Sequence, residues 1–210
     1  MQFGKNGGNN GKKFPFSSFL PKYYLYFIIK RYEKVFSAYG FNKKFLHYED
    51  VLAMLEKFSV IPVEDRTYSC PFLLFSRKDG KRILVYNPDE HPERLVLTLG
   101  HELGHLMCGH YKEDVLNGKS NLRINARNER DADIIGYLCW IPTFYLNRKS
   151  EEFFDVEVLL KDLTDCDTDY EFFYENLPAR LRIYRAYLKA REKVKQMQDV
   201  IEEIQGKKSE

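Results

Sequence analysis

The chain has 210 residues, of which 44% are hydrophobic and 15% aromatic, so it can bury a sizeable core and is not a disordered chain. Its net charge of +2 conceals an uneven distribution. Residues 1–45 hold nine Lys or Arg against one Glu, residues 46–175 hold 15 basic against 25 acidic residues, and residues 176–210 hold nine basic against five acidic residues. An acidic middle, with a net charge of −10, therefore lies between two basic ends.

Two classes of protein are excluded by the pattern of apolar and cysteine residues. The sequence contains no apolar run of about 18 residues, so we expect no membrane-spanning helix, and it lacks the order of a secretory signal. Its cysteines are widely spaced and form no C-x-x-C pair, which argues against a zinc ribbon or a dense disulfide framework; they are Cys70, Cys108, Cys139 and Cys166. We therefore expect a cytoplasmic protein with reduced cysteines.

The first half of the chain predicts two helices and a hairpin. Apolar residues at helical spacing predict a helix over residues 19–39 and a second amphipathic helix over residues 48–58. Residues 71–76 and 83–86 have the composition of strands, and the Asp79-Gly80 pair between them is typical of a tight hairpin turn.

The second half is helical. Pro92 suits the first turn of a helix, which we expect to run to about His110. Further helices are predicted over residues 125–140 and from Leu177 almost to the end. The chain is therefore predicted to be α+β and mostly helical, with a small antiparallel sheet packed on the helix that begins at Pro92.

One motif in that helix carries recognisable chemistry: His101-Glu102-Leu-Gly-His105, an H-E-x-x-H pattern. Residues at i and i+4 lie on one side of a helix, so both imidazoles can bind one metal ion. Glu102 lies beside them, where it can accept a proton from a metal-bound water. His110 is nine residues beyond His101, and we expect it to cap the helix or to bind a backbone carbonyl rather than to be a fourth ligand.

A catalytic zinc site needs a third protein ligand. The next helix offers Glu129 and Asp133, which are also four residues apart, so one carboxylate can bind the metal while the other orients a histidine. Asp131 projects to another face and is the weaker candidate.

These motifs resemble the ImmA/IrrE family of zinc metallopeptidases. The resemblance rests on residues 101–105, on Glu129-Arg-Asp-Ala-Asp133 and on the apolar helix that ends at Pro142. It departs from the family at Asp131, where Glu is commoner, and at residues 134–136, where an aromatic residue and Ala are usual. The resemblance implies a zincin-like minimal domain of gluzincin type, one Zn²⁺ per chain, Glu129 as the third ligand and Asp133 as the residue that orients a histidine.

The resemblance covers about residues 46–190. We predict a metallopeptidase domain over that range, a basic and partly flexible N-terminal extension with a helix over residues 1–45, and a charged helical tail over residues 191–210. The extension mixes Lys with aromatic residues, as nucleic-acid-binding segments do. The helical spacing of these aromatic residues favours a packed helix, so we expect no direct contact with nucleic acid.

The expected substrate is a protein. In such proteases the strand before the active helix pairs with extended substrate, which predicts that role for Ile83, Leu84, Val85 and Tyr86. The acidic middle would attract a basic partner, although the charge can equally serve to solvate the domain. The resemblance implies a helix-turn-helix repressor of a phage or mobile element, cleaved by an anti-repressor. A non-proteolytic repressor-binding protein and a toxin–antitoxin partner are the alternatives.

Overall fold

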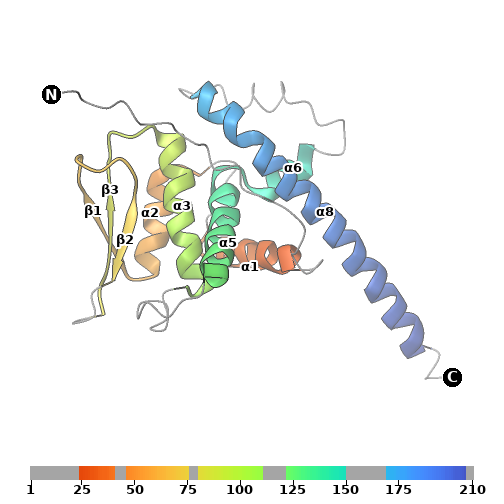
Figure 1. Cartoon of the computed structure of the whole chain (residues 1–210). Coiled ribbons are helices and arrows are strands. Elements are labelled where there is room, and N and C mark those ends of the chain that lie inside the picture. Colours follow the sequence, from red (N-terminus) through yellow and green to blue (C-terminus); the bar gives the residue numbers. More distant parts are fainter. Residues whose placement is uncertain (1–23, 41–45, 76–79, 111–121, 150–168, 207–210) are drawn as a thin grey trace.

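The computed structural model describes residues 24–40, 46–75, 80–110, 122–149 and 169–206, and the statements that follow concern these ranges. It is an α+β structure in which helices dominate, as predicted (Figure 1). The elements in chain order are α1 (Tyr24–Ala38), α2 (Tyr48–Lys57), β1 (Val60–Glu64), β2 (Phe72–Phe75), β3 (Arg82–Tyr86), α3 (Pro92–Cys108), α5 (Leu122–Trp140), α6 (Thr143–Lys149) and α8 (Tyr170–Gly206).

The sheet has three strands in the order β1-β3-β2. Strands β2 and β3 are antiparallel, as the hairpin pattern predicts, whereas β1 runs parallel to β3. The sheet is therefore mixed, and the expectation of a purely antiparallel sheet is corrected. Strand β1 was not predicted because Pro62 lies at its centre, and proline removes a backbone donor that an interior strand needs. An edge strand tolerates this loss, and β1 is at the edge.

The position of β3 overturns one prediction about the substrate. Both sides of β3 are paired: Ile83 lies opposite Ile61 of β1 and opposite Leu74 of β2. Its backbone groups are therefore taken by neighbouring strands, and no edge is left for an added chain. The prediction that Ile83, Leu84, Val85 and Tyr86 pair with substrate is wrong for this reason.

Helix α2 connects the sheet to the helix that carries the H-E-x-x-H motif. It packs on β1 and on α3, and it is the helix with the most extensive contact with the sheet. The sheet and α3 also contribute side chains to one hydrophobic core, in agreement with the predicted packing of the sheet on this helix. Leu55 of α2, Leu84 of β3 and Leu99 of α3 are fully buried in one hydrophobic core.

Helix α3 has clear signals at both ends, which explains why its bounds match the prediction. The His91 side chain accepts a hydrogen bond from the Glu93 N–H, and Pro92 occupies the first helical position. Gly109 ends the helix in the left-handed conformation, with φ of 73°, which glycine adopts without strain. These caps fix the length of α3 and thereby the position of its two motif histidines.

Glycines bring α3 and α5 unusually close. A methyl group added at Gly104 would lie 2.7 Å from the Ala132 Cα, and one added at Gly100 would lie 2.8 Å from the Cys139 Cβ. On the facing helix, a methyl group at Gly136 would lie 2.7 Å from the Leu97 carbonyl oxygen. The two backbones can approach this closely only because these positions lack a Cβ. This contact sets the distance between the side chains of α3 and those of α5.

Helix α1 belongs to the same core, although it precedes the predicted domain. Its residues Leu25, Ile29 and Tyr32 are buried, and the Tyr32 hydroxyl donates a 2.7 Å hydrogen bond to the Leu138 carbonyl of α5. Residues 1–23 of the predicted extension lie outside the described residues, and the boundary at residue 46 stays a prediction. The contacts of α1 show that part of the basic N-terminal segment packs in the hydrophobic core.

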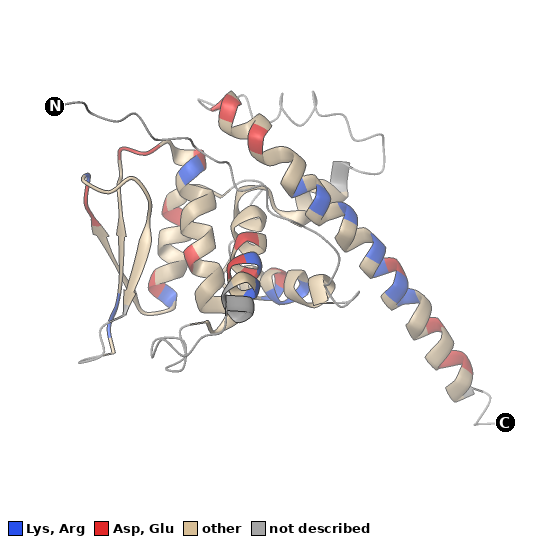
Figure 2. Cartoon of the chain, in the orientation of Figure 1, with Lys and Arg blue, Asp and Glu red and all other residues tan. Residues whose placement is uncertain are grey.

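Helix α8 runs without interruption from Tyr170 to Gly206, so it includes both the end of the predicted domain and the start of the predicted tail. Its Arg180 is fully buried and donates to the Ile141 carbonyl and the Thr143 hydroxyl, which ties the helix to the end of α5. The distal half projects away from the rest of the structure (Figure 1). Charge along α8 changes from acidic to basic and again to acidic (Figure 2). None of the described helices is long and apolar enough to cross a bilayer.

Candidate metal centre

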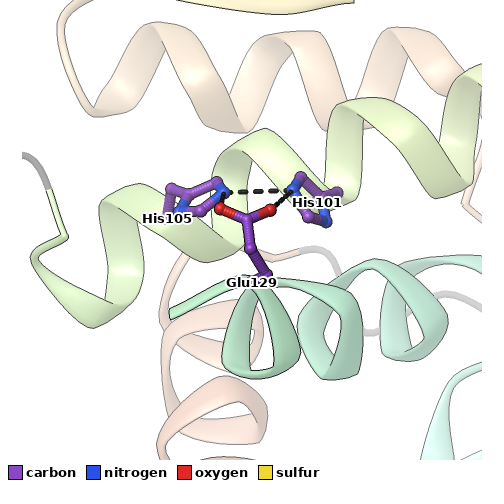
Figure 3. A group of neighbouring side chains, drawn as sticks. All are labelled: His101, His105 and Glu129. Atoms are coloured by element: carbon purple, nitrogen blue, oxygen red, sulfur yellow. Dashed lines mark hydrogen bonds and ion pairs between the residues drawn. The ribbon is translucent and has the colours of Figure 1, made fainter. Parts of the chain in front are cut away.

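Three side chains from α3 and α5 converge on one point (Figure 3). The Nε2 atoms of His101 and His105 lie 3.0 Å apart. The two carboxylate oxygens of Glu129 lie 3.4 Å from the His101 Nε2 and 3.6 Å from the His105 Nε2. Both histidines are largely buried, whereas Glu129 is exposed and reaches them from the facing helix.

These separations match the size of a zinc site. Four ligand atoms placed 2.0–2.1 Å from a tetrahedral zinc ion lie about 3.3–3.4 Å from one another. The three distances between His101, His105 and Glu129, from 3.0 to 3.6 Å, bracket this value. The residues therefore fit a metal ion with two imidazoles and one carboxylate, which leaves one position for water or substrate.

Asp133 orients the first of these histidines. Its carboxylate lies 2.8 Å from the Nδ1 atom of His101, on the side of the ring away from the convergence point. Burial lowers the pKa of His101, but the hydrogen bond and negative charge of Asp133 outweigh it and raise the pKa above its usual value. A proton held on Nδ1 by this carboxylate leaves the Nε2 lone pair directed at the metal position.

His110 orients the second histidine. The Nδ1 atoms of His105 and His110 lie 2.9 Å apart, again on the side away from the convergence point. Burial, followed by the charges of His101 and His110, lowers the pKa of His105 to about 3. His105 is therefore neutral near pH 7, as a ligand must be. The expectation that the His110 side chain binds a backbone carbonyl is corrected, since its partner is the ring of His105.

The chemistry of the converging atoms also favours a cation. When both Nδ1 atoms carry the ring protons, the two Nε2 lone pairs face each other at 3.0 Å with the Glu129 carboxylate beside them. Three electron-rich groups at this separation repel one another unless a positive ion lies between them. The arrangement is therefore typical of a metal-binding site rather than of a hydrogen-bonded cluster.

A family model decides the classification. The model of the M78 peptidases, described as the IrrE N-terminal-like domain, matches residues 47–183. The chain belongs to this family. The match covers more than half of the chain, and it includes the three converging residues. No curated protein and no solved structure matches the chain significantly.

Glu102 is the remaining residue of the H-E-x-x-H motif in this IrrE N-terminal-like domain. Glu102 follows His101 directly and is half-buried, and its charge contributes to the raised pKa of His101. Its carboxylate therefore lies close to the metal site without belonging to the three converging groups. This is the position expected for a group that binds a proton rather than the metal.

In this IrrE N-terminal-like domain, Asp131 does not belong to the group of side chains that converge at the metal centre. Its buried carboxylate accepts a hydrogen bond from the Tyr24 hydroxyl of α1, and Arg130 and Arg127 approach it at 3.5 and 3.8 Å. It thus holds α1 against α5 and is not a ligand, in agreement with its different helix face.

Sequence reasoning missed two contributors to the site. The role of His110 depends on a contact made beyond the end of α3, because Gly109 turns the chain back toward His105. Gly104 was assigned no role from the sequence, although its missing side chain permits the approach of α5. The pattern of Gly100 and Gly104, four residues apart on one helix face, is the signal that could have revealed the close contact.

Proposed function

We propose that the protein is a zinc-dependent endopeptidase that hydrolyses a peptide bond in a protein substrate. The observation that carries this proposal is the convergence of His101, His105 and Glu129 at the separations of zinc ligands. An ion held by two histidines and one carboxylate keeps an open position for the reacting water. The family assignment supports peptidase chemistry.

The roles of the residues follow from their positions. A zinc ion bound at this site would lower the pKa of a bound water and polarise the scissile carbonyl. Glu102 accepts the proton of that water and passes it to the leaving amine. Asp133 and His110 hold the two imidazoles in the tautomers that present Nε2 to the metal.

The sharpest test replaces Glu102 by Gln. Because Glu102 is not among the converging ligands, the Glu102→Gln protein should still bind one zinc ion while cleavage falls by at least about a hundredfold. Glu129→Ala should lose zinc as well as cleavage. Glu49→Gln, an exposed change on α2, is the matched control and should alter neither. Zinc content by elemental analysis and cleavage by mass spectrometry are the two measurements.

The same variant separates the peptidase from a binding protein. A protein that only sequesters a repressor, or that acts as a toxin–antitoxin partner, would inactivate its target equally well with Gln at position 102. Undiminished inactivation by Glu102→Gln would therefore contradict the proposed mechanism.

The substrate that we propose is a helix-turn-helix repressor of a phage or mobile element, so that the protein acts as a cytoplasmic anti-repressor. The net charge of −10 over residues 46–175 supports a basic partner, because opposite charges steer association. Co-expression with a candidate repressor and a search for new termini by mass spectrometry test this assignment. An intact repressor that remains bound to its operator would contradict it.

Because β3 is paired on both sides, an extended substrate could add only to an outer strand of the sheet, β1 or β2. We assign it to β2 because Pro62 removes a backbone donor from β1, whereas Phe72–Phe75 contains no proline. Replacing Leu73 by Pro in β2 should raise KM for a peptide substrate while zinc binding is retained. An unchanged KM would exclude this edge.

A further inference from the structure

A cavity of about 400 Å³ lies between α1, the C-terminal end of α3 and α5. Its volume is within the range of about 300–1,000 Å³ that is usual for small-molecule sites. Helix α1, which lies against α5 (Figure 1), contributes one face to it, formed by Tyr24, Phe27, Ile28 and Arg31 at helical spacing. This helix precedes residues 47–183, which match the family model, so the cavity depends on a segment outside the matched domain.

The walls of the cavity are largely apolar. Ile28, Met107 and Ile135 are buried in them and are 8%, 3% and 1% exposed. Phe27 of the same lining is 62% exposed, although it is a large aromatic residue. Apolar surface in a concave site favours the binding of an apolar body, because binding removes both surfaces from water.

The charged groups of the cavity leave an excess of positive charge. Its lining includes Arg31, Arg127 and Asp131. The Asp131 carboxylate is matched by Arg127 and Arg130, which lie 3.8 and 3.5 Å away. Arg31 is exposed, and no carboxylate of the described residues forms an ion pair with it. Burial and the charge of Asp131 raise the pKa of the Cys108 thiol in the same lining, whereas the charge of Arg31 lowers it, so Arg31 lies near the wall formed by α3.

A buried acceptor in the lining is a second polar feature. Asp131 is 2% exposed, and the Tyr24 hydroxyl donates to its Oδ2 atom. Its Oδ1 atom is buried and receives no hydrogen bond from the described residues. Buried carboxylate oxygens normally have a donor, so this atom favours an ordered water or a bound molecule in the cavity. Together with the apolar walls and the excess positive charge, it suits a molecule that has an apolar body and a negative charge.

We propose that this cavity binds a small organic carboxylate with an apolar body, whose charge pairs with Arg31 and whose body packs on Phe27. His110 forms part of the same lining. Its Nδ1 atom lies 2.9 Å from the Nδ1 atom of His105, whereas the Nε2 atom of His105 faces the convergence point of the metal ligands. The cavity therefore lies behind the ring of a metal ligand. A protein substrate must reach the open metal position on the other side of that ring, so the molecule in the cavity is separate from the substrate.

The contact between His110 and His105 couples the cavity to the metal centre. A molecule packed against His110 restricts the movement of its ring and holds it against His105, which is the arrangement that presents Nε2 to the metal. Binding of the carboxylate therefore raises zinc affinity, and zinc raises the affinity for the carboxylate by the same factor. This coupling rests on the proposed zinc site, whereas binding to the cavity does not.

The first experiment titrates the full-length protein with phenylbutyrate in a calorimeter, with and without zinc. We expect one molecule to bind per chain. Phenylbutyramide, which has the same body without the charge, should bind at least about tenfold more weakly, and Arg31→Gln should weaken phenylbutyrate binding by a similar factor. Phe27→Ala should also weaken it. Lys34→Gln, which removes an exposed charge of α1 outside the cavity, is the matched control and should bind like the parent.

The second experiment measures zinc affinity by competition with a chelator, with and without saturating phenylbutyrate. Zinc affinity should rise at least about fivefold in the parent and in Lys34→Gln. It should not change in Arg31→Gln at the same concentration, because the cavity is then unoccupied. His110→Ala should still bind phenylbutyrate, but its zinc affinity should no longer respond. Circular dichroism of the variants checks that each is folded.

Four results would overturn the proposal. Absence of binding by both phenylbutyrate and octanoate excludes this class of ligand. Binding that is unaffected by Arg31→Gln and Phe27→Ala places the site elsewhere. Binding without a change in zinc affinity contradicts the coupling through His110. Competition between phenylbutyrate and a peptide substrate assigns the cavity to an acidic side chain of the substrate. A protein that binds no zinc would instead contradict the proposed function, while the titration without zinc would still decide whether the cavity binds a carboxylate.

Discussion

The Nδ1 atom of His105 lies 2.9 Å from the Nδ1 atom of His110, a residue beyond the end of the helix that carries the metal-binding motif. The other motif histidine is supported differently, since a carboxylate lies 2.8 Å from the Nδ1 of His101. One ligand is therefore oriented by a negative charge and the other by a neutral ring. This asymmetry keeps the charge of the site low, because a second carboxylate beside His105 would add to those of Asp133, Glu129 and Glu102.

The contact with His110 predicts a loss of metal affinity when that ring is removed. His110→Ala should weaken zinc binding about 10–100-fold, the usual effect of removing a group that orients a metal-bound histidine. His110→Asn should recover most of the affinity, because its amide oxygen can accept the His105 Nδ1 proton. Competition with a chromogenic chelator measures both constants. Equal affinities for the Ala and Asn variants would contradict an orienting role.

The carboxylate beside His101 predicts a change in that residue's titration. In the metal-free protein, Asp133→Asn should lower the pKa of His101, because burial then acts without the opposing hydrogen bond and charge. A pH titration followed by NMR of the imidazole measures the shift. Phe144→Leu, a change on α6, serves as the control and should leave the titration unchanged.

The raised pKa of His101 also makes the free energy of unfolding depend on pH. A pKa of His101 raised in the folded state stabilises the metal-free protein below the unfolded-state pKa of about 6.5, and this stabilisation is lost as pH rises through the folded-state pKa. Asp133→Asn should therefore reduce the unfolding free energy more at pH 5 than at pH 8. Denaturant unfolding in the presence of a chelator gives the comparison, and an equal loss at both pH values would contradict it.

Part of this site is visible in the sequence because it is local. His101, Glu102 and His105 are separated by fewer than two helical turns, and their geometry follows from the helix alone. The sequence alone does not decide whether Glu129 or Asp133 of α5 binds the metal, because helical spacing places both on one face without fixing the distance to α3. The family resemblance was needed to choose Glu129. The contact between Gly104 and Ala132 fixes that distance, and a long-range contact of this kind has no local sequence pattern.

The sheet illustrates the same limit. The hairpin of β2 and β3 is encoded by adjacent strand and turn signals and was predicted. The parallel pairing of β1 with β3 joins segments about 20 residues apart, and its composition is weakened by Pro62. The error about the substrate strand followed directly, since a two-stranded hairpin would have left one side of β3 open.

The close approach of the helices predicts that Gly104 is sensitive to a single methyl group. Gly104→Ala would place a Cβ 2.7 Å from the Ala132 backbone, so α5 must move away from α3. We expect a loss of about 1–3 kcal/mol in the free energy of unfolding from overpacking. Zinc affinity should fall as well, because Glu129 moves with α5.

Thr98→Ala is the matched control for this substitution. Thr98 lies on the same helix, and its hydroxyl donates to the Arg94 and Leu95 carbonyls in the preceding turn of α3. The change should therefore affect stability little and should leave zinc affinity unchanged. If Gly104→Ala binds zinc as tightly as Thr98→Ala, the packing of α5 on α3 does not set the ligand geometry.

The cysteines predict a selective pattern of alkylation. Burial, followed by the charge of Asp131, raises the pKa of the Cys108 thiol to about 11 from the usual 9.0. Its thiolate fraction at pH 8 is therefore about a hundredfold lower than that of an ordinary thiol, and the thiolate is the species that reacts. Burial also raises the pKa of Cys139, whereas Cys70 is exposed. Iodoacetamide at pH 8 should consequently label Cys70 far faster than Cys108 or Cys139.

Peptide mass spectrometry of the labelled protein resolves these three sites, with Cys166→Ser introduced because Cys166 lies outside the described residues. Raising the pH to 10 should increase the rate at Cys108 about tenfold for each unit, since the thiolate fraction rises in that proportion below the pKa. Adding denaturant at pH 8 should bring all three rates together, because unfolding removes both burial and the nearby Asp131 charge. Labelling of Cys108 as fast as that of Cys70 in the folded protein at pH 8 would contradict the raised pKa of the Cys108 thiol.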